Sequence, residues 1–279
     1  AGRSYDPCEF SALAISKGFP KALAIHMGKI LECAAITALP GSGSDCMLGT
    51  LRKDSFVVEP LNPERKCTTL SVAAHSLYEK SNPYELPGPG GAIDLHKTTF
   101  TQLSESQVEV RGTEFVPTED YYVKLEGVRR VGYRTISPAA THDPVMISQI
   151  DEVIRGVRNR VEDNFNMKDS RNTWLDFKVY GKKGVMHMFP ETPESSSDEL
   201  LIIIEAVAPT QEEANTLCSF ARSTMLHYGY EGRISTAGNL AFPFSPSDCR
   251  MGEVFEFNVY HLLRVADPCE PFPIHLLEL

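Results

Sequence analysis

Residues 26–49, HMGKILECAAITALPGSGSDCMLG, combine side-chain types that acid–base and nucleophilic chemistry require. Successive residues of a helix turn by about 100°, so an amphipathic helix would place His26, Lys29 and Cys33 on one face. The Gly/Ser loop after this helix adds two glycines, an acid and a second thiol: Gly41, Gly43, Asp45 and Cys46. Because free backbone amides in such a loop can hold a carboxylate or phosphate, this segment is the first candidate site.

In the catalytic interpretation of this segment, His26 is a general base, Lys29 is an electrophile or anion clamp, and Cys46 is a nucleophile. The loop lacks the Lys-Ser/Thr ending of a P-loop, which argues against nucleotide hydrolysis. The structural alternative is a helix with a buried Cys33 and a solvated Lys29 that pairs with Glu32, followed by a plain solvent-exposed loop.

Residues 90–97, GGAIDLHK, offer a second candidate site. Alternate residues of a strand share a face, so Asp94 and His96 are predicted to form an acid/base pair. An Asp-x-His pair suits a metal only with further ligands, and none is spaced helpfully, so no metal site is predicted. The alternative is a solvated sheet edge.

Residues 124–137, KLEGVRRVGYRTIS, form a cationic cluster in a chain whose formal net charge is −10. Arginine binds carboxylates and phosphates through two parallel hydrogen bonds. We therefore expect Lys124, Arg130 and Arg134 to bind an acid or a phosphate group. The alternative is a set of salt bridges with the many Asp and Glu residues of the same chain.

A long polar and aromatic loop over residues 232–248 precedes the last predicted strand. Loops of this length in compact domains are usually functional or disordered, and the aromatic residues argue against disorder. The alternative is a plain long connection. The residues expected to line a pocket here are Arg233, Ser235, Asn239, Ser245 and Asp248, with Phe242 and Phe244 as apolar walls.

Length and composition limit the class of protein. A chain of 279 residues, 42% of them hydrophobic, can form one large globular domain or two ordinary ones. The negative net charge argues against a nucleic-acid coat, and no apolar run reaches the about 18 residues of a membrane span. The seven widely spaced cysteines include no CxxC pair, which favours a reducing, cytoplasmic setting over a disulfide framework or a zinc site.

Hydrophobic spacing predicts the elements that must position these residues. Helices are expected at 7–16, 20–37, 69–80, 143–165 and 210–230, and strands at 55–59, 107–116, 121–136, 173–181, 199–208 and 252–267. The Pro/Gly-rich segment 83–100 is typical of a loop or domain seam. From residue 119 the order β-α-β-β-α-β matches a ferredoxin-like unit. We therefore expect an α+β fold (an α/β sandwich), with an α/β portion over 1–95 and a ferredoxin-like domain over 96–279.

Eight segments, spread in order over nearly the whole chain, together resemble the acyclic terpene utilisation AtuA family. They are AGRSYDP (1–7), HMGKILECAA (26–35), PGSGSDCMLGTL (40–51), LSVAAHSLYE (70–79), PGGAIDL (89–95), VEVRGTEF (108–115), YVKLEGVRRVGYRTI (122–136) and AGNLAFPFSPSD (237–248). The resemblance implies catabolism of branched, terpenoid or related acids, often as CoA thioesters. It supplies no agreed catalytic residues. Family members normally begin well before a segment like AGRSYDP, so we expect this chain to begin inside a domain.

The resemblance, together with these candidate residues, implies a cytosolic enzyme of branched or terpenoid carboxylic acid or acyl-CoA metabolism. The expected step is that of a lyase, hydratase or isomerase passing through an enolate-like state, which needs a base and a cationic or amide oxyanion site. No cofactor is expected, and CoA would enter only as part of the substrate. The rival hypothesis is a non-catalytic subunit or ligand-binding module that completes a larger complex with another copy or a second polypeptide.

Overall fold

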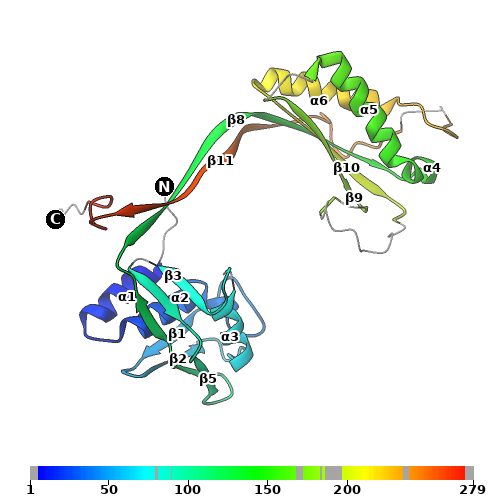
Figure 1. Cartoon of the computed structure of the whole chain (residues 1–279). Helices are drawn as coiled ribbons and strands as arrows, with labels where there is room; N and C mark the ends of the chain where they lie inside the picture. Colours follow the sequence, from blue (N-terminus) through cyan, green and yellow to red (C-terminus); the bar gives the residue numbers. More distant parts are fainter. Residues whose placement is uncertain are drawn as a thin grey trace, which may run out of the picture. The chain divides into compact units, whose positions relative to one another are not determined.

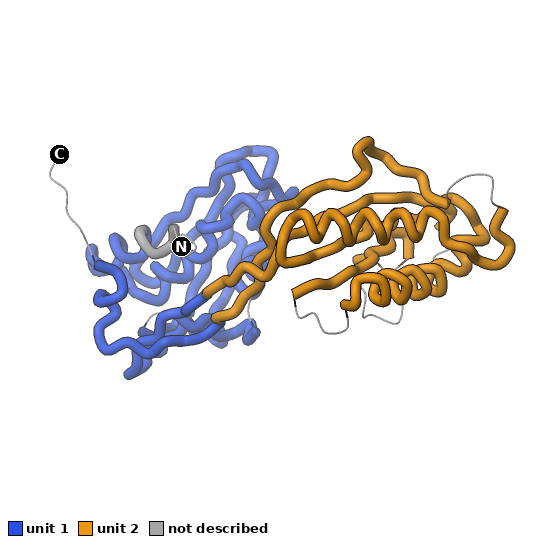
Figure 2. Tube along the Cα trace, turned by 90° about the horizontal axis from the view of Figure 1, so that it is seen from above, with its two compact units in different colours: residues 1–126, 260–279 blue, residues 127–259 orange. Residues whose placement is uncertain are grey.

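The computed structural model of this protein describes residues 6–78, 81–88, 90–167, 172–182, 184–185, 197–234 and 239–273 (Figure 1). The chain divides into two compact units (Figure 2). Unit 1 comprises Ala1–Glu126 and Tyr260–Leu279, and unit 2 comprises Gly127–Val259. The expected boundary at 95/96 differs from this division because strands after residue 95 pair with strands before it.

Unit 1 contains short helices and two small antiparallel sheets. The helices are α1 (Asp6–Ser16), α2 (Lys21–Glu32), the 3₁₀ helix η1 (Ala34–Ile36) and α3 (Thr69–Leu77). One sheet has the order β1 (Met47–Leu51), β2 (Ser55–Pro60), β6 (Val108–Arg111), β5 (Thr99–Gln102). The other has the order β3 (Glu85–Gly88), β4 (Gly91–Asp94), β7 (Glu114–Pro117), so a hairpin forms inside the segment predicted as a loop.

The core of unit 1 lies between α2 and the four-stranded sheet. Leu23, Met27 and Ile30 recur at helical spacing on α2 and pack with buried residues of β2 and β6, including Phe56 and Val110. Burial of this apolar face stabilises a helix that has no side-chain cap at its N-terminus.

The predicted strand 107–116 is interrupted at Gly112, and its two halves join different sheets. Gly112 has φ of +80°, and a Cβ atom there would clash with the Lys97 carbonyl oxygen. Only glycine suits this close approach in the left-handed region. The chain therefore leaves β6, which pairs with β2, and enters β7, which pairs with β4.

Unit 2 has the ferredoxin-like order that the sequence predicts. Its elements are β8 (Tyr121–Thr141), α4 (Pro144–Ser148), α5 (Ile150–Phe165), β9 (Trp174–Tyr180), β10 (Leu200–Ala208), α6 (Gln211–Leu226) and β11 (Cys249–Val265). The first residues of β8 and the last of β11 belong to unit 1. The sheet order is β11-β8-β10-β9, and β10 pairs antiparallel with both neighbours.

Helices α5 and α6 cover one face of this sheet (Figure 1). Ile202 and Ile204 of β10 pack with Val157 of α5 and Leu217 of α6, all of them buried. The predicted helix 143–165 is two helices, because Gln149 between α4 and α5 has φ of −111° and ψ of 10°. No helix in the described ranges has the length and apolar character needed to cross a membrane.

Candidate functional site

Asp94 and His96 form a hydrogen-bonded pair at the end of β4 in unit 1. The Asp94 Oδ1 and His96 Nδ1 atoms are 2.7 Å apart, and the His96 backbone N–H donates to the same oxygen at 2.8 Å. The strand ends at Asp94, so a tight turn brings the pair together rather than a shared strand face. These two bonds, the backbone one first, hold the pKa of Asp94 below its ordinary value.

The surroundings of the pair leave the imidazole accessible. The His96 side chain is 57% exposed and stacks on Tyr84, with ring centroids 5.0 Å apart. Within the described part of the chain, His96 Nε2 makes no hydrogen bond. Asp94 lies in register between Glu85 of β3 and Glu114 of β7, so these carboxylates form a row across the small sheet. This arrangement suits a residue that takes and returns a proton.

His26 lies in the core of unit 1, with no exposed surface. Its Nδ1 is 2.8 Å from the Thr113 hydroxyl, and its Nε2 is 2.9 Å from the Ser76 hydroxyl. Since the Ser76 hydroxyl donates to the Val72 carbonyl at 2.9 Å, it accepts from Nε2–H, which makes Nδ1 the acceptor from Thr113. His26 thus links three parts of the core, and neither ring nitrogen faces solvent.

The other residues predicted on α2 do not share a reactive face with His26. Lys29 Nζ donates to the His75 carbonyl at 3.1 Å and lies 4.3 Å from the centre of the Tyr78 ring. Cys33 lies beyond the last residue of the helix with φ of −117° and is exposed. The helix is shorter than predicted, which is why Cys33 leaves the expected face.

The Gly/Ser loop is organised by Arg65, a residue that the sequence analysis missed. This buried guanidinium, 3% exposed, pairs with Asp45 at 3.0 Å and donates to the carbonyl oxygens of Ala35, Ala38 and Pro40. Asp45 therefore neutralises a buried cation. No local spacing signals this role, because the partners lie 20 to 30 residues from Arg65.

The tip of the same loop is open. Gly41 and Gly43 are exposed, and a Cβ atom at either position would meet no described atom within 4 Å. Cys46 is also exposed. The backbone N–H of Ser44 donates to the Ser42 hydroxyl at 3.1 Å, which occupies one of the amides expected to bind an anion.

The predicted cationic cluster is distributed over ion pairs. Lys124 pairs with Glu126 at 2.5 Å, and Arg130 pairs with Glu253 at 2.6 Å. Arg134 lies 2.5 Å from the buried carboxylate of Glu205. This arrangement corresponds to the intramolecular alternative, in which the acids of the chain neutralise these cations.

Two residues predicted to line a pocket in the loop 232–248, Arg233 and Asn239, form hydrogen bonds within the chain instead. Arg233 Nε donates to the Asn239 side-chain oxygen at 2.6 Å, and Asn239 Nδ2 donates to the Tyr228 carbonyl at 2.9 Å. These bonds hold the chain that comes after α6. Ser235 lies outside the described residues.

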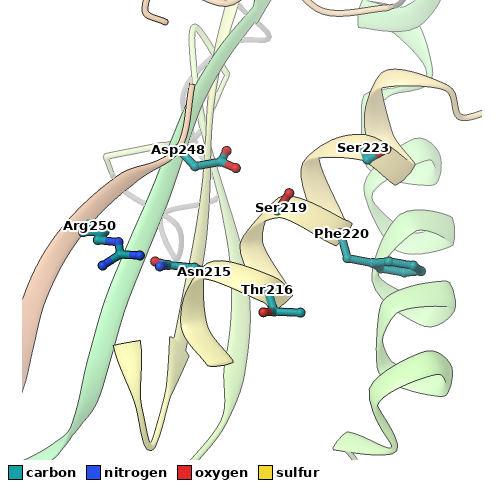
Figure 3. Close-up of a pocket in the computed structure, with 7 residues that line it drawn as sticks. All are labelled: Asn215, Thr216, Ser219, Phe220, Ser223, Asp248 and Arg250. Carbon is teal, nitrogen blue, oxygen red and sulfur yellow. The ribbon is translucent and has the colours of Figure 1, made fainter. Parts of the chain in front are cut away.

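Unit 2 contains a cavity of about 640 Å³ along α6 that is wide open to solvent (Figure 3). Asp248, predicted as a pocket residue, is part of its lining. The sequence analysis missed the others, although three hydroxyl residues at helical spacing on α6 were a usable signal. The full lining is Asn215, Thr216, Ser219, Phe220, Ser223, Asp248 and Arg250.

Two buried thiols are unsuited to nucleophilic chemistry. Burial raises the pKa of Cys67 to about 11 and that of Cys218 to about 12, so both are protonated at neutral pH. Among the residues that the structure describes, no group of three or more His, Cys, Asp and Glu side chains is arranged to hold a metal ion.

Comparison with known proteins identifies a family. A family model described as acyclic terpene utilisation family protein AtuA matches residues 54–242, which is more than half of the chain. The matched range includes Asp94 and His96 and all of α6, and it excludes residues 26–49. No curated protein matches, and no solved structure matches.

The role of Arg65 predicts a large effect from a charge-conserving change. Arg65→Lys should lower the free energy of unfolding by about 2 kcal/mol or more, because a lysine cannot serve three carbonyl oxygens and Asp45 together. Urea denaturation measures this. Arg52→Lys is the control, since Arg52 is 49% exposed and, among the described residues, pairs with Glu109. Equal losses in the two variants would contradict the assignment.

The Asp94–His96 bond predicts a shift in titration. His96→Phe keeps the ring beside Tyr84 and the backbone bond, so the pKa of Asp94 should rise yet stay below its ordinary value. Because the pKa of Asp94 is lower in the folded protein than in the unfolded chain, its carboxylate stabilises the fold above the ordinary pKa, and this contribution is lost as the pH falls through the lowered pKa. The pH range between these two pKa values should be narrower in the variant. NMR titration of the Asp94 carboxyl carbon tests it, and an unchanged pKa would refute the side-chain bond.

Proposed function

We propose that this chain, which belongs to the acyclic terpene utilisation AtuA family, is an enzyme acting on a branched or terpenoid carboxylic acid or its acyl-CoA. Its reaction is a lyase, hydratase or isomerase step, and His96 is the acid–base residue. The observation that carries this proposal is the 2.7 Å contact between Asp94 and an accessible His96, inside the range that the family model matches.

The pair supplies the proton transfer that these reactions share. The Asp94 carboxylate accepts Nδ1–H of His96, which places the lone pair of neutral imidazole on Nε2. Nε2 removes a proton from the carbon next to the carbonyl group, and the C–H electron pair moves onto the carbonyl oxygen to give an enolate. The Asp94 carboxylate stabilises the imidazolium that forms, as in other carboxylate–histidine pairs.

The three reaction types differ only in the fate of the enolate. An isomerase returns the proton from Nε2 to a different carbon of the substrate. A lyase expels a group from the next carbon, and this leaving group takes the proton from Nε2. A hydratase runs that elimination in reverse: Nε2 takes a proton from water as the oxygen adds to the double bond, and the enolate that forms takes this proton on carbon. None of these steps transfers electrons to or from an outside acceptor, so the scheme balances with the substrate, water and one titratable side chain.

The test is a panel of branched acids and their CoA thioesters incubated with the protein in D₂O and analysed by mass spectrometry. Deuterium uptake at carbon, gain of one water or cleavage into two products identifies the reaction type. His96→Gln should lower the rate by roughly 10²–10⁴-fold, the usual contribution of a general base. Asp94→Asn should lower it by a comparable factor, because an amide can donate to Nδ1 and would then leave the proton on Nε2.

His261→Gln is the matched control, since His261 is exposed and distant in sequence from the pair. It should keep the rate of the unaltered protein. Full activity of His96→Gln, or equal losses in both histidine variants, would contradict the assignment of His96.

A second candidate function is that of a non-catalytic subunit. It is favoured by apolar side chains that are exposed in the single chain: Phe255 and Phe257 of β11 are 53% and 70% exposed, and Val259 continues the same alternation. Alternate residues of a strand share a face, and contiguous apolar patches commonly mark contacts between proteins. Absence of any turnover across the panel, together with a second polypeptide in the native mass, would favour this function.

A further inference from the structure

The cavity on α6 has one wall of hydroxyl groups. Thr216, Ser219 and Ser223 recur at positions i, i+3 and i+7, so they lie on one side of the helix (Figure 3). Phe220 adds an aromatic surface and packs edge-on against Phe165 of α5, with ring centroids 5.4 Å apart. Thr216 donates its hydroxyl proton to the Glu212 carbonyl at 2.9 Å, and the Ser219 oxygen accepts from Arg222 Nη2 at 3.0 Å. A ligand here would therefore meet an acceptor at Thr216 and a donor at Ser219.

The facing wall carries one cation and one anion at a fixed spacing. Asp248 and Arg250 are two residues apart in extended chain, so their side chains leave on the same side, about 7 Å apart. Asp248 accepts two hydrogen bonds from Arg222, at 2.8 and 3.2 Å. The Asp248 carboxylate is thereby held in one orientation while it still has lone pairs for a donor on a ligand.

Arg250 is positioned by an amide and not by a carboxylate. The Asn215 amide is assigned with its oxygen toward Arg250, because the opposite orientation would set the amide nitrogen against the guanidinium N–H groups. Arg250 then donates to this oxygen from Nε at 2.9 Å and from Nη2 at 3.0 Å. The Asn215 nitrogen then donates to the Thr135 hydroxyl, which fixes the amide. No carboxylate in the described ranges pairs with Arg250, in contrast to Arg130 and Arg222. Its charge and its Nη1 donors therefore remain available in the cavity.

We propose that this cavity binds a small hydroxycarboxylate. The ligand's carboxylate lies on Arg250, and its hydroxyl group donates to Asp248 and bonds with the hydroxyl row of α6. The cation of Arg250 lies near the carboxylate of Asp248. This pair suits a ligand that carries one negative charge and one hydroxyl donor better than it suits a phosphate dianion. This site lies in unit 2 and rests on the cavity alone, without reference to the catalytic role of His96.

Calorimetric titration of the whole chain tests the proposal with three probes of one carbon skeleton. The first, 3-hydroxy-3-methylbutanoate, carries both the carboxylate and the hydroxyl group. The second, 3-methylbutanoate, carries only the carboxylate, and the third, 3-methylbutane-1,3-diol, carries only hydroxyl groups. The hydroxy acid should bind at least about tenfold more tightly than either of the others, because only it can bond to Arg250 and to Asp248 at the same time.

Arg250→Gln should weaken binding of the hydroxy acid about tenfold or more, and Asp248→Asn should remove the preference for the hydroxy acid over 3-methylbutanoate. Arg160→Gln is the control, because it removes the same charge from an exposed position on α5 of the same unit. Circular dichroism shows whether each variant is folded.

Three results would overturn the proposal: no binding of the hydroxy acid to the unaltered protein, equal affinity for all three probes, or equal losses in Arg250→Gln and Arg160→Gln. Since the titration measures binding without turnover, an inactive His96 would leave its outcome unchanged.

Discussion

Antiparallel strand register is the constraint that positions the charged side chains in both units. In unit 1, the pairing of β4 with β3 and β7 places Asp94 between Glu85 and Glu114 and ends the strand where the turn to His96 begins. In unit 2, the register of β10 turns Ile202 and Ile204 toward the helices and Glu205 toward the opposite face. A slip of one residue would exchange these faces, so burial of the apolar residues fixes the positions of the charged ones.

Satisfaction of polar groups separates structural side chains from chemically available ones. His26 and Arg65 belong to residue types typical of active sites, yet each is buried and forms its hydrogen bonds with other residues of unit 1. Losing such a partner leaves a buried group unsatisfied, which is costly, so these residues stabilise unit 1. His96 differs because one nitrogen is held by Asp94 and the other is accessible.

The pairing of cations with carboxylates likewise separates structural charges from available ones. The chain is acidic, and most of its described cations, such as Arg130, Arg134 and Lys124, are neutralised by nearby carboxylates. Arg250 is held by the neutral amide of Asn215 and keeps its charge available. An acidic protein can therefore retain a site for an anion where an amide, and not a carboxylate, orients the cation.

The sequence by itself determined the features that depend on neighbouring residues. Hydrophobic spacing predicted α5, α6 and the strands of unit 2 in their ferredoxin-like order, and the motifs placed the chain in its family. The contact between Asp94 and His96 was also predictable, because its partners are two residues apart. Only the tertiary structure decided the burial of His26 and the pairing of Arg130 with Glu253, 123 residues away. Such contacts depend on which helices and strands pack together, and the spacing of neighbouring residues in the sequence does not predict that packing.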